Sequence, residues 1–97
     1  SRLARAEAEP LVVRLSAVRG LARVEKGGKL AAGLRPVLEG AKDARVRGLA
    51  AQTLAVHAGP QACAAVKAQA RRENEEARVH YEEALARCGA SAPGDGP

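Results

Sequence analysis

The chain has 97 residues, a net charge of +5 and 46% hydrophobic residues, yet it lacks Phe, Trp and Met and has a single tyrosine. This length predicts one domain with a narrow core, which must be built mainly from Ala, Leu and Val. No apolar run reaches about 18 residues, so we expect no membrane-spanning segment.

Apolar residues recur at helical spacing in five stretches, and we predict an all-α fold with one helix in each. The expected helices cover residues 9–24, 29–41, 44–57, 60–72 and 75–88. Gly27-Gly28 and Gly59-Pro60 precede the second and fourth stretches, as is typical of turns where a glycine ends one helix and a proline starts the next. Pro36 lies inside the second helix and removes one backbone hydrogen bond, so we expect a kink or a split there.

The first, third and fifth stretches form an internal repeat. Three segments superimpose at offsets of 33 and 31 residues, namely Val13 to Val24, Val46 to His57 and Ala77 to Cys88. A period of this size is typical of stacked helical units, each too small to bury its own apolar face. We therefore expect the aligned positions to face a shared core, with His57 and Cys88 among them. Tyr81 stands where the other copies have alanine, and we expect it to seal the C-terminal end.

The segment from Asp43 to Gly59 resembles the first helix of a short HEAT-like repeat of the phycobilisome-lyase type. It has the acidic turn, the Val-Arg pair, the paired alanines, the leucine and the closing glycine of that pattern. The resemblance extends over residues 9–89, and it implies a short right-handed α-solenoid of about five antiparallel helices, or two and a half HEAT-like repeats. Members of such families are mostly protein-binding scaffolds, and a few are pigment lyases or DNA-repair enzymes.

The last predicted helix also resembles the second helix of a tetratricopeptide repeat. That pattern is carried by Ala77, Tyr81, Ala84 and Leu85, whereas residues 61–68 lack the aromatic and Leu-Gly positions that the preceding helix of such a repeat should have. Both resemblances imply the same class of function. We expect residues 1–89 to form the helical repeat domain and residues 90–97 to be a disordered tail or linker.

The predicted function is a non-catalytic protein-interaction or scaffold module, which we expect to be part of a longer protein. In solenoids of paired helices the second helices commonly form the concave face, and here they would carry a basic strip. The strip consists of Lys29, Arg35, Lys42, Lys67, Arg71 and Arg72. Its expected partner is an acidic protein surface. Two alternatives are an ordinary solvated surface and a nucleic-acid-binding module, although the chain has no aromatic stacking platform for bases.

The first predicted helix is apolar around most of its circumference. Val12 and Leu15 lie outside the expected core stripe, and we predict a hydrophobic end surface there. Such a surface would pack against a preceding domain or against a second copy of the chain.

No catalytic constellation or cofactor motif is recognisable in the sequence. Asp43, Glu73 and Glu76 are expected at turns or helix starts, where carboxylates accept hydrogen bonds from free backbone N–H groups. The two cysteines, Cys63 and Cys88, lack the short spacing of a structural zinc site, so we predict no metal. A Cys63–Cys88 disulfide is an alternative that requires export, whereas the expected location is cytoplasmic.

Overall fold

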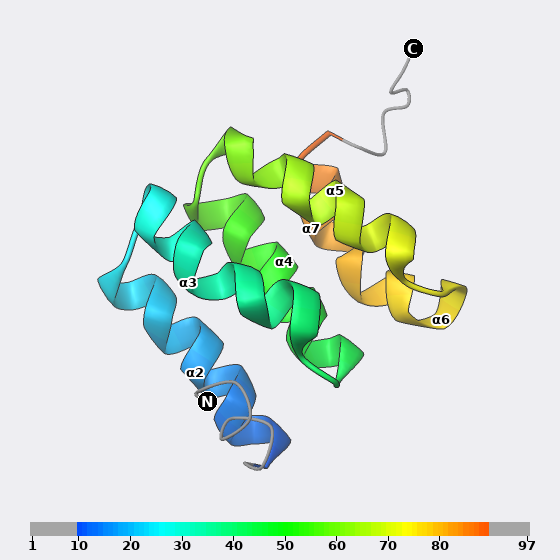
Figure 1. Ribbon diagram of the computed structural model, residues 1–97, viewed down its shortest axis with the longest axis horizontal. Helices are drawn as coiled ribbons and strands as arrows, with labels where there is room; N and C mark the ends of the chain where they lie inside the picture. The colour runs from blue at the N-terminus through cyan, green and yellow to red at the C-terminus, as the bar shows by residue number, and fades with distance from the viewer. Residues whose placement is uncertain (1–9, 90–97) are drawn as a thin grey trace.

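The computed structural model describes residues 10–89, and this part of the chain is helical without β-strands (Figure 1). The main helices and the two 3-10 turns follow in chain order: α2 Leu11–Val24, α3 Gly27–Gly40, α4 Ala44–His57, η1 Pro60–Ala62, α5 Cys63–Arg72, α6 Glu75–Arg78, η2 Val79–Tyr81 and α7 Glu82–Arg87. The all-α prediction is confirmed. The predicted tail at residues 90–97 and the first residue of the first predicted helix lie outside the described part.

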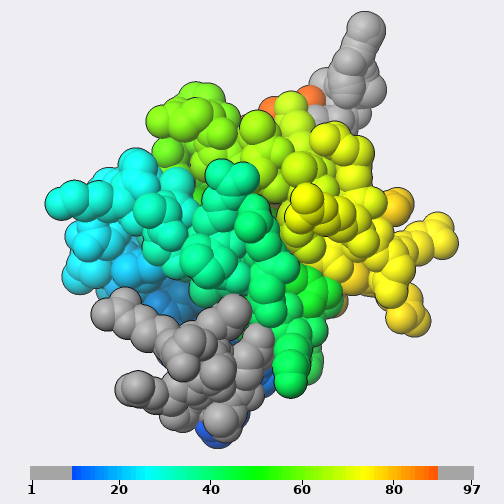
Figure 2. Space-filling model, in the orientation of Figure 1, coloured from blue at the N-terminus to red at the C-terminus, as the bar shows by residue number. Residues whose placement is uncertain are grey.

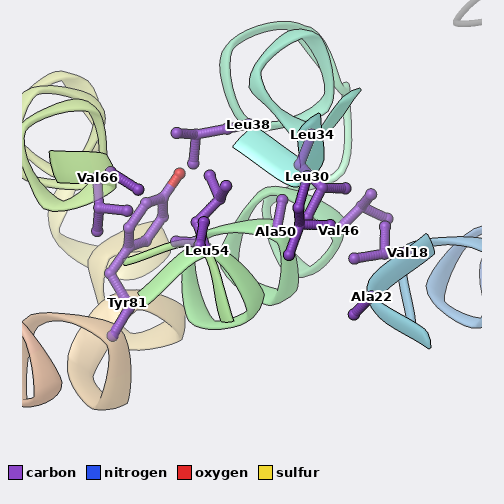
Figure 3. Close-up of a cluster of buried hydrophobic side chains, with 14 of the residues drawn as sticks. Val18, Ala22, Leu30, Leu34, Leu38, Val46, Ala50, Leu54, Val66 and Tyr81 are labelled. Atoms are coloured by element: carbon purple, nitrogen blue, oxygen red, sulfur yellow. The ribbon is translucent and has the colours of Figure 1, made fainter. Parts of the chain in front are cut away.

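The helices form two layers, and Figure 3 shows them nearly end-on. One layer contains α2, α4 and the segment from α6 to α7, while the other contains α3 and α5. α4 packs against α2, α3, α5 and α7, whereas α2 packs mainly against α3 and α4. The central repeat copy is therefore covered on several sides, and the first copy lies at an edge.

Local sequence signals account for the helix ends. Asp43 caps α4, because its carboxylate accepts a 2.8 Å hydrogen bond from the backbone N–H of Arg45. The Arg45 side chain also holds the pKa of Asp43 at about 2. Asn74 caps α6 in the same way through the N–H of Ala77. Gly59 has a φ of 97° after α4, a backbone conformation that favours glycine.

α3 continues through Pro36 as one helix, so the predicted split does not occur. The proline leaves the carbonyl of Ala32 without its usual helical donor. Ala32 and Pro36 are both exposed, and water can therefore hydrogen-bond that carbonyl.

The core consists of small and branched aliphatic side chains that lie between the two layers of helices (Figure 3). The fully buried residues of α3, α4, α5 and η2 include Leu30, Leu34, Leu38, Val46, Ala50, Leu54, Val66 and Tyr81. Tyr81 is 0% exposed and lies between α4 and α5, so the prediction that it seals an end is wrong. As the largest side chain of this core, it fills the space left by small neighbours.

α2 presents a different face to the core from the one that the repeat alignment predicted. Val18 and Ala22 are buried, and Leu15 packs partly against the same cluster. Val13 and Val24, which the alignment placed in the core, are 44% and 74% exposed. The reason is that α2 is an edge helix, and within the described residues it packs mainly against α3 and α4.

The predicted helix 75–88 is interrupted by the 3-10 turn η2, where it passes closest to α4. A Cβ atom on Gly48 would lie 2.5 Å from Cβ and 2.7 Å from the carbonyl oxygen of His80. Gly48 thus allows the two backbones to touch. His80 and His57 have exposed side chains, so the interpretation of His57 as a core residue is wrong.

Cys63 and Cys88 form a disulfide bond, with a Cα–Cα distance of 5.7 Å. The bond joins the start of α5 to the residue after α7, across a sequence separation of 25 residues. Cys88 is half-buried rather than a fully buried core residue. The structure therefore contains the Cys63–Cys88 disulfide that the sequence analysis gave as an alternative.

Candidate functional site

A buried polar cluster links α4, the end of α5 and η2. The guanidinium of Arg47 donates from Nε and Nη2 to the two carboxylate oxygens of Glu73, at 2.6 and 2.9 Å. Tyr81 Oη and Gln69 Nε2 donate to the same carboxylate. Glu73 is only 7% exposed. The ion pair with Arg47, together with the hydrogen bonds from Tyr81 and Gln69, lowers the pKa of Glu73 to about 2.

The remaining hydrogen bonds of Arg47 explain why this cluster is structural. Its Nη1 donates to the carbonyl oxygens of Ala41 and Lys42, at 2.6 and 2.9 Å, and so fixes the turn before α4. Burial, followed by the neighbouring Glu73 carboxylate, raises the pKa of Tyr81. These groups therefore bind one another and hold three helical elements together. Glu73 lies in the turn between α5 and α6, as expected, but its carboxylate accepts hydrogen bonds from side chains, and Asn74 caps α6 instead.

The predicted basic strip is distributed over α3, α5 and the turn between α3 and α4. α3 and α5 lie side by side in one layer, and Figure 2 shows their shared outer face. Of the six strip residues, five are exposed and Lys67 is half-buried. The structure thus brings the two groups of cations, one from each helix, onto the same layer. Whether they bind a partner stays a prediction.

Few carboxylates neutralise this strip. Arg35 forms an exposed ion pair with Glu39, with Nε and Oε2 2.8 Å apart. Arg72 approaches the neutral Gln69 at 3.5 Å. Lys29, Lys67 and Arg71 form no ion pair within residues 10–89. The outer face of this layer consequently keeps an excess of positive charge.

A groove lies between α3 and α5. It has a volume of about 330 Å³, and Arg35 lies at its edge. The other lining residues are mostly alanines, namely Ala31, Leu54, Gln61, Ala62, Ala64, Ala65 and Ala68. The two helices thus offer a small apolar surface, and Arg35, the cation among its described lining residues, is paired with Glu39.

A second groove, of about 530 Å³, lies on the opposite layer. Its walls come from α2 and from the end of α7, and its floor comes from α4. The lining residues are Arg19, Ala22, Arg23, Lys26, Leu49, Gln52, Thr53, Val56, His57 and Arg87. The sequence prediction missed this groove, because the strip was assigned to the second helices alone.

The predicted hydrophobic end surface is reproduced only in part. Val12 is 67% exposed, while Leu15 is half-buried and packs against the core. The naming of Leu15 as a surface residue is therefore wrong, because α2 turns that side towards its neighbours. Val13 and Val24 are the other exposed valines of this helix.

Within residues 10–89, no three His, Cys, Asp or Glu side chains are grouped so as to hold a metal ion. None of the helices in that range is long and apolar enough to cross a membrane. Comparison of the chain with known protein families, with curated proteins and with solved structures gives no match.

Proposed function

We propose that this chain is a protein-interaction or scaffold module that binds through the outer face of the α3–α5 layer. The observation that carries the proposal is an alanine-lined groove between α3 and α5, the two helices that also carry Lys29, Lys67 and Arg71, which form no ion pair in the described chain. An acidic protein surface would supply the missing carboxylates and cover the apolar strip.

The proposal includes the finer architecture, a short right-handed α-solenoid of two and a half HEAT-like repeats. Support comes from the alternation of helices between two layers, with α2, α4 and α7 in one and α3 and α5 in the other. In this arrangement each pair of helices is one repeat, and the last repeat lacks its second helix. Binding through an extended outer face is typical of such arrays.

Nucleic acid is the alternative partner. The same cations could contact phosphates, but the single aromatic residue, Tyr81, is fully buried and offers no stacking surface for a base. An acidic protein is therefore the better match to a face that combines alanine side chains with positive charge.

The cytoplasmic location expected from the sequence stays a prediction. The Cys63–Cys88 disulfide favours an oxidising compartment instead, because such bonds are rare in the reducing cytosol.

The test compares capture of proteins by the wild-type chain and by a charge-reversed variant. The variant is Lys29→Glu/Arg35→Glu/Arg71→Glu, since all three side chains are exposed and their reversal should leave the melting curve nearly unchanged. Proteins retained from a cell extract are identified by mass spectrometry. We expect an acidic set that the variant loses and that the control Arg19→Glu/Arg23→Glu, on the opposite layer, retains.

Retention of the same proteins by the charge-reversed variant would exclude the α3–α5 face. Binding of a random DNA duplex is measured in parallel by electrophoresis at increasing salt. A strong complex whose affinity falls steeply with salt would favour the nucleic-acid alternative, because phosphate contacts release counterions.

A further inference from the structure

The groove between α2, α4 and α7 combines an apolar floor with a basic rim. Arg19, Arg23 and Lys26 lie at i, i+4 and i+7 along one side of α2 and the residues that follow it. Arg87 lies on the α7 side. Among residues 10–89, no aspartate or glutamate lines the groove.

The rim cations have few partners of their own. Arg19 and Arg23 form no ion pair in the described chain, and Lys26 donates only to the carbonyl oxygen of Ala22, at 3.3 Å. Arg87 approaches the carboxylate of Glu83 at 3.5 Å, outside the groove. Positive charge is therefore concentrated around a hollow without a matching negative group.

Helix dipoles offset only part of this positive charge. The C-terminal ends of α2, α4 and α7 contribute lining residues, and each end carries about half a negative charge. Together these ends offset less charge than Arg19, Arg23 and Lys26 supply, even when Arg87 is assigned to Glu83. The groove consequently remains electropositive, and it favours an anionic occupant.

The floor determines what kind of anion fits. Leu49 and Val56 come from one side of α4, and Val56 is 41% exposed. The buried hydroxyl of Thr53 already donates to the carbonyl oxygen of Leu49, at 2.7 Å, so it does not require a ligand. An occupant must therefore present apolar side chains to the floor and carboxylates to the rim. The lining residues of α4 run from Leu49 to His57, which corresponds to about 12 Å, or two helical turns.

We propose that this groove binds an acidic amphipathic helix from a partner protein. Apolar side chains of that helix, spaced by one turn, contact α4, and Asp or Glu residues on its flanks pair with the cations of α2 and α7. This second surface is independent of the proposed α3–α5 face, and either one can bind without the other.

The test uses a synthetic, fluorescently labelled helical peptide as the probe. It carries leucines at i, i+4 and i+7 and glutamates on both flanks, and its affinity is measured by fluorescence anisotropy. Two control peptides have the same composition in scrambled order, or lysine in place of every glutamate. We expect binding of the first peptide only, with amide NMR shifts confined to residues that line the groove.

Variants of the chain then separate the contributions of rim and floor. Arg19→Glu/Arg23→Glu should weaken binding by at least about tenfold, as expected for charges that contact the partner. Val56→Ser, which removes apolar surface without changing charge, should weaken it severalfold. Lys29→Glu/Arg71→Glu, on the opposite layer, should have no effect. Melting curves followed by circular dichroism show whether each variant is folded.

Three results would overturn the proposal. They are equal affinity for the scrambled peptide, unchanged binding by folded Arg19→Glu/Arg23→Glu, and tighter binding of a random DNA duplex that depends on the same two arginines. Retention of the same captured proteins by the charge-reversed variant of the α3–α5 face, with peptide binding intact, would refute the proposed function and leave this inference standing.

Discussion

Neutralising Glu73 should destabilise the domain far more than neutralising an exposed glutamate with the same kind of partner. In Glu73→Gln, the buried Arg47 guanidinium loses its counter-charge, while Tyr81 keeps a hydrogen-bond acceptor. Removing one member of a buried ion pair typically costs about 3 to 5 kcal/mol. Arg47 retains its two carbonyl acceptors, so the lower end, about 3 kcal/mol, is expected.

The lowered pKa of Glu73 leads to a similar loss of folding stability. Its fall from 4.5 to about 2 corresponds to roughly 3 kcal/mol of preference for the charged form, at about 1.4 kcal/mol per pKa unit. For a domain of this size, such a loss should lower the melting temperature by about 12 to 24 °C. Urea unfolding followed by circular dichroism measures the loss, and the dependence on urea concentration should stay the same.

Glu39→Gln is the matched control. Glu39 also pairs with an arginine Nε, at 2.8 Å compared with 2.6 Å for Glu73, but its pair with Arg35 is exposed. Exposed pairs contribute about 0 to 1 kcal/mol. The double variant Arg47→Met/Glu73→Gln should be less destabilised than the sum of its single changes, because no unpaired charge remains. Equal losses in Glu73→Gln and Glu39→Gln would refute the role assigned to burial.

Three further changes test other parts of the structure. Because the pKa of Glu73 is lowered to about 2, its contribution to folding stability is complete above about pH 5 and is lost as the pH falls towards 2. The urea midpoint of the wild-type chain should therefore drop over that range, and the midpoint of Glu73→Gln should drop less. Reductant should destabilise the wild-type chain by about 3 kcal/mol, since the disulfide closes a loop of 25 residues. It should not affect Cys63→Ser/Cys88→Ser, and equal shifts in the melting temperature of both proteins would contradict a stabilising role of the disulfide. Gly48→Ala should lower thermal stability by more than about 1 kcal/mol, because its Cβ would meet backbone atoms of η2, whereas Gly20→Ala, with nothing within 4 Å, should be neutral or stabilising. Tolerance of Gly48→Ala in a melting experiment would show that the two backbones are not in contact.

Helix positions could be predicted from the sequence because their signals are local. Gly59-Pro60 ends one helix and starts the next, and Asp43 caps α4 through a residue two positions away. Each signal acts within a few residues and does not depend on the rest of the fold. The boundaries of α4 were therefore obtained without knowledge of its neighbours.

The direction in which each helix faces could not be obtained in this way. The aligned position is buried at Val46 but 44% exposed at Val13, because α4 is surrounded and α2 lies at an edge. The cluster of Arg47, Glu73 and Tyr81 was missed for a related reason. Its ion pair joins residues separated by 26 positions, and no periodicity connects them.

α4 contributes to both candidate surfaces, and this affects how they can be separated by experiment. Leu54 lines the groove of the α3–α5 layer, while its neighbour Thr53 lines the groove of the opposite layer. Both side chains are buried, so replacing either one would disturb the packing that supports the two grooves together. The rim cations are exposed and belong to different helices. Charge reversals at the rims, rather than substitutions in α4, are therefore the changes that can distinguish two independent binding surfaces from a general loss of structure.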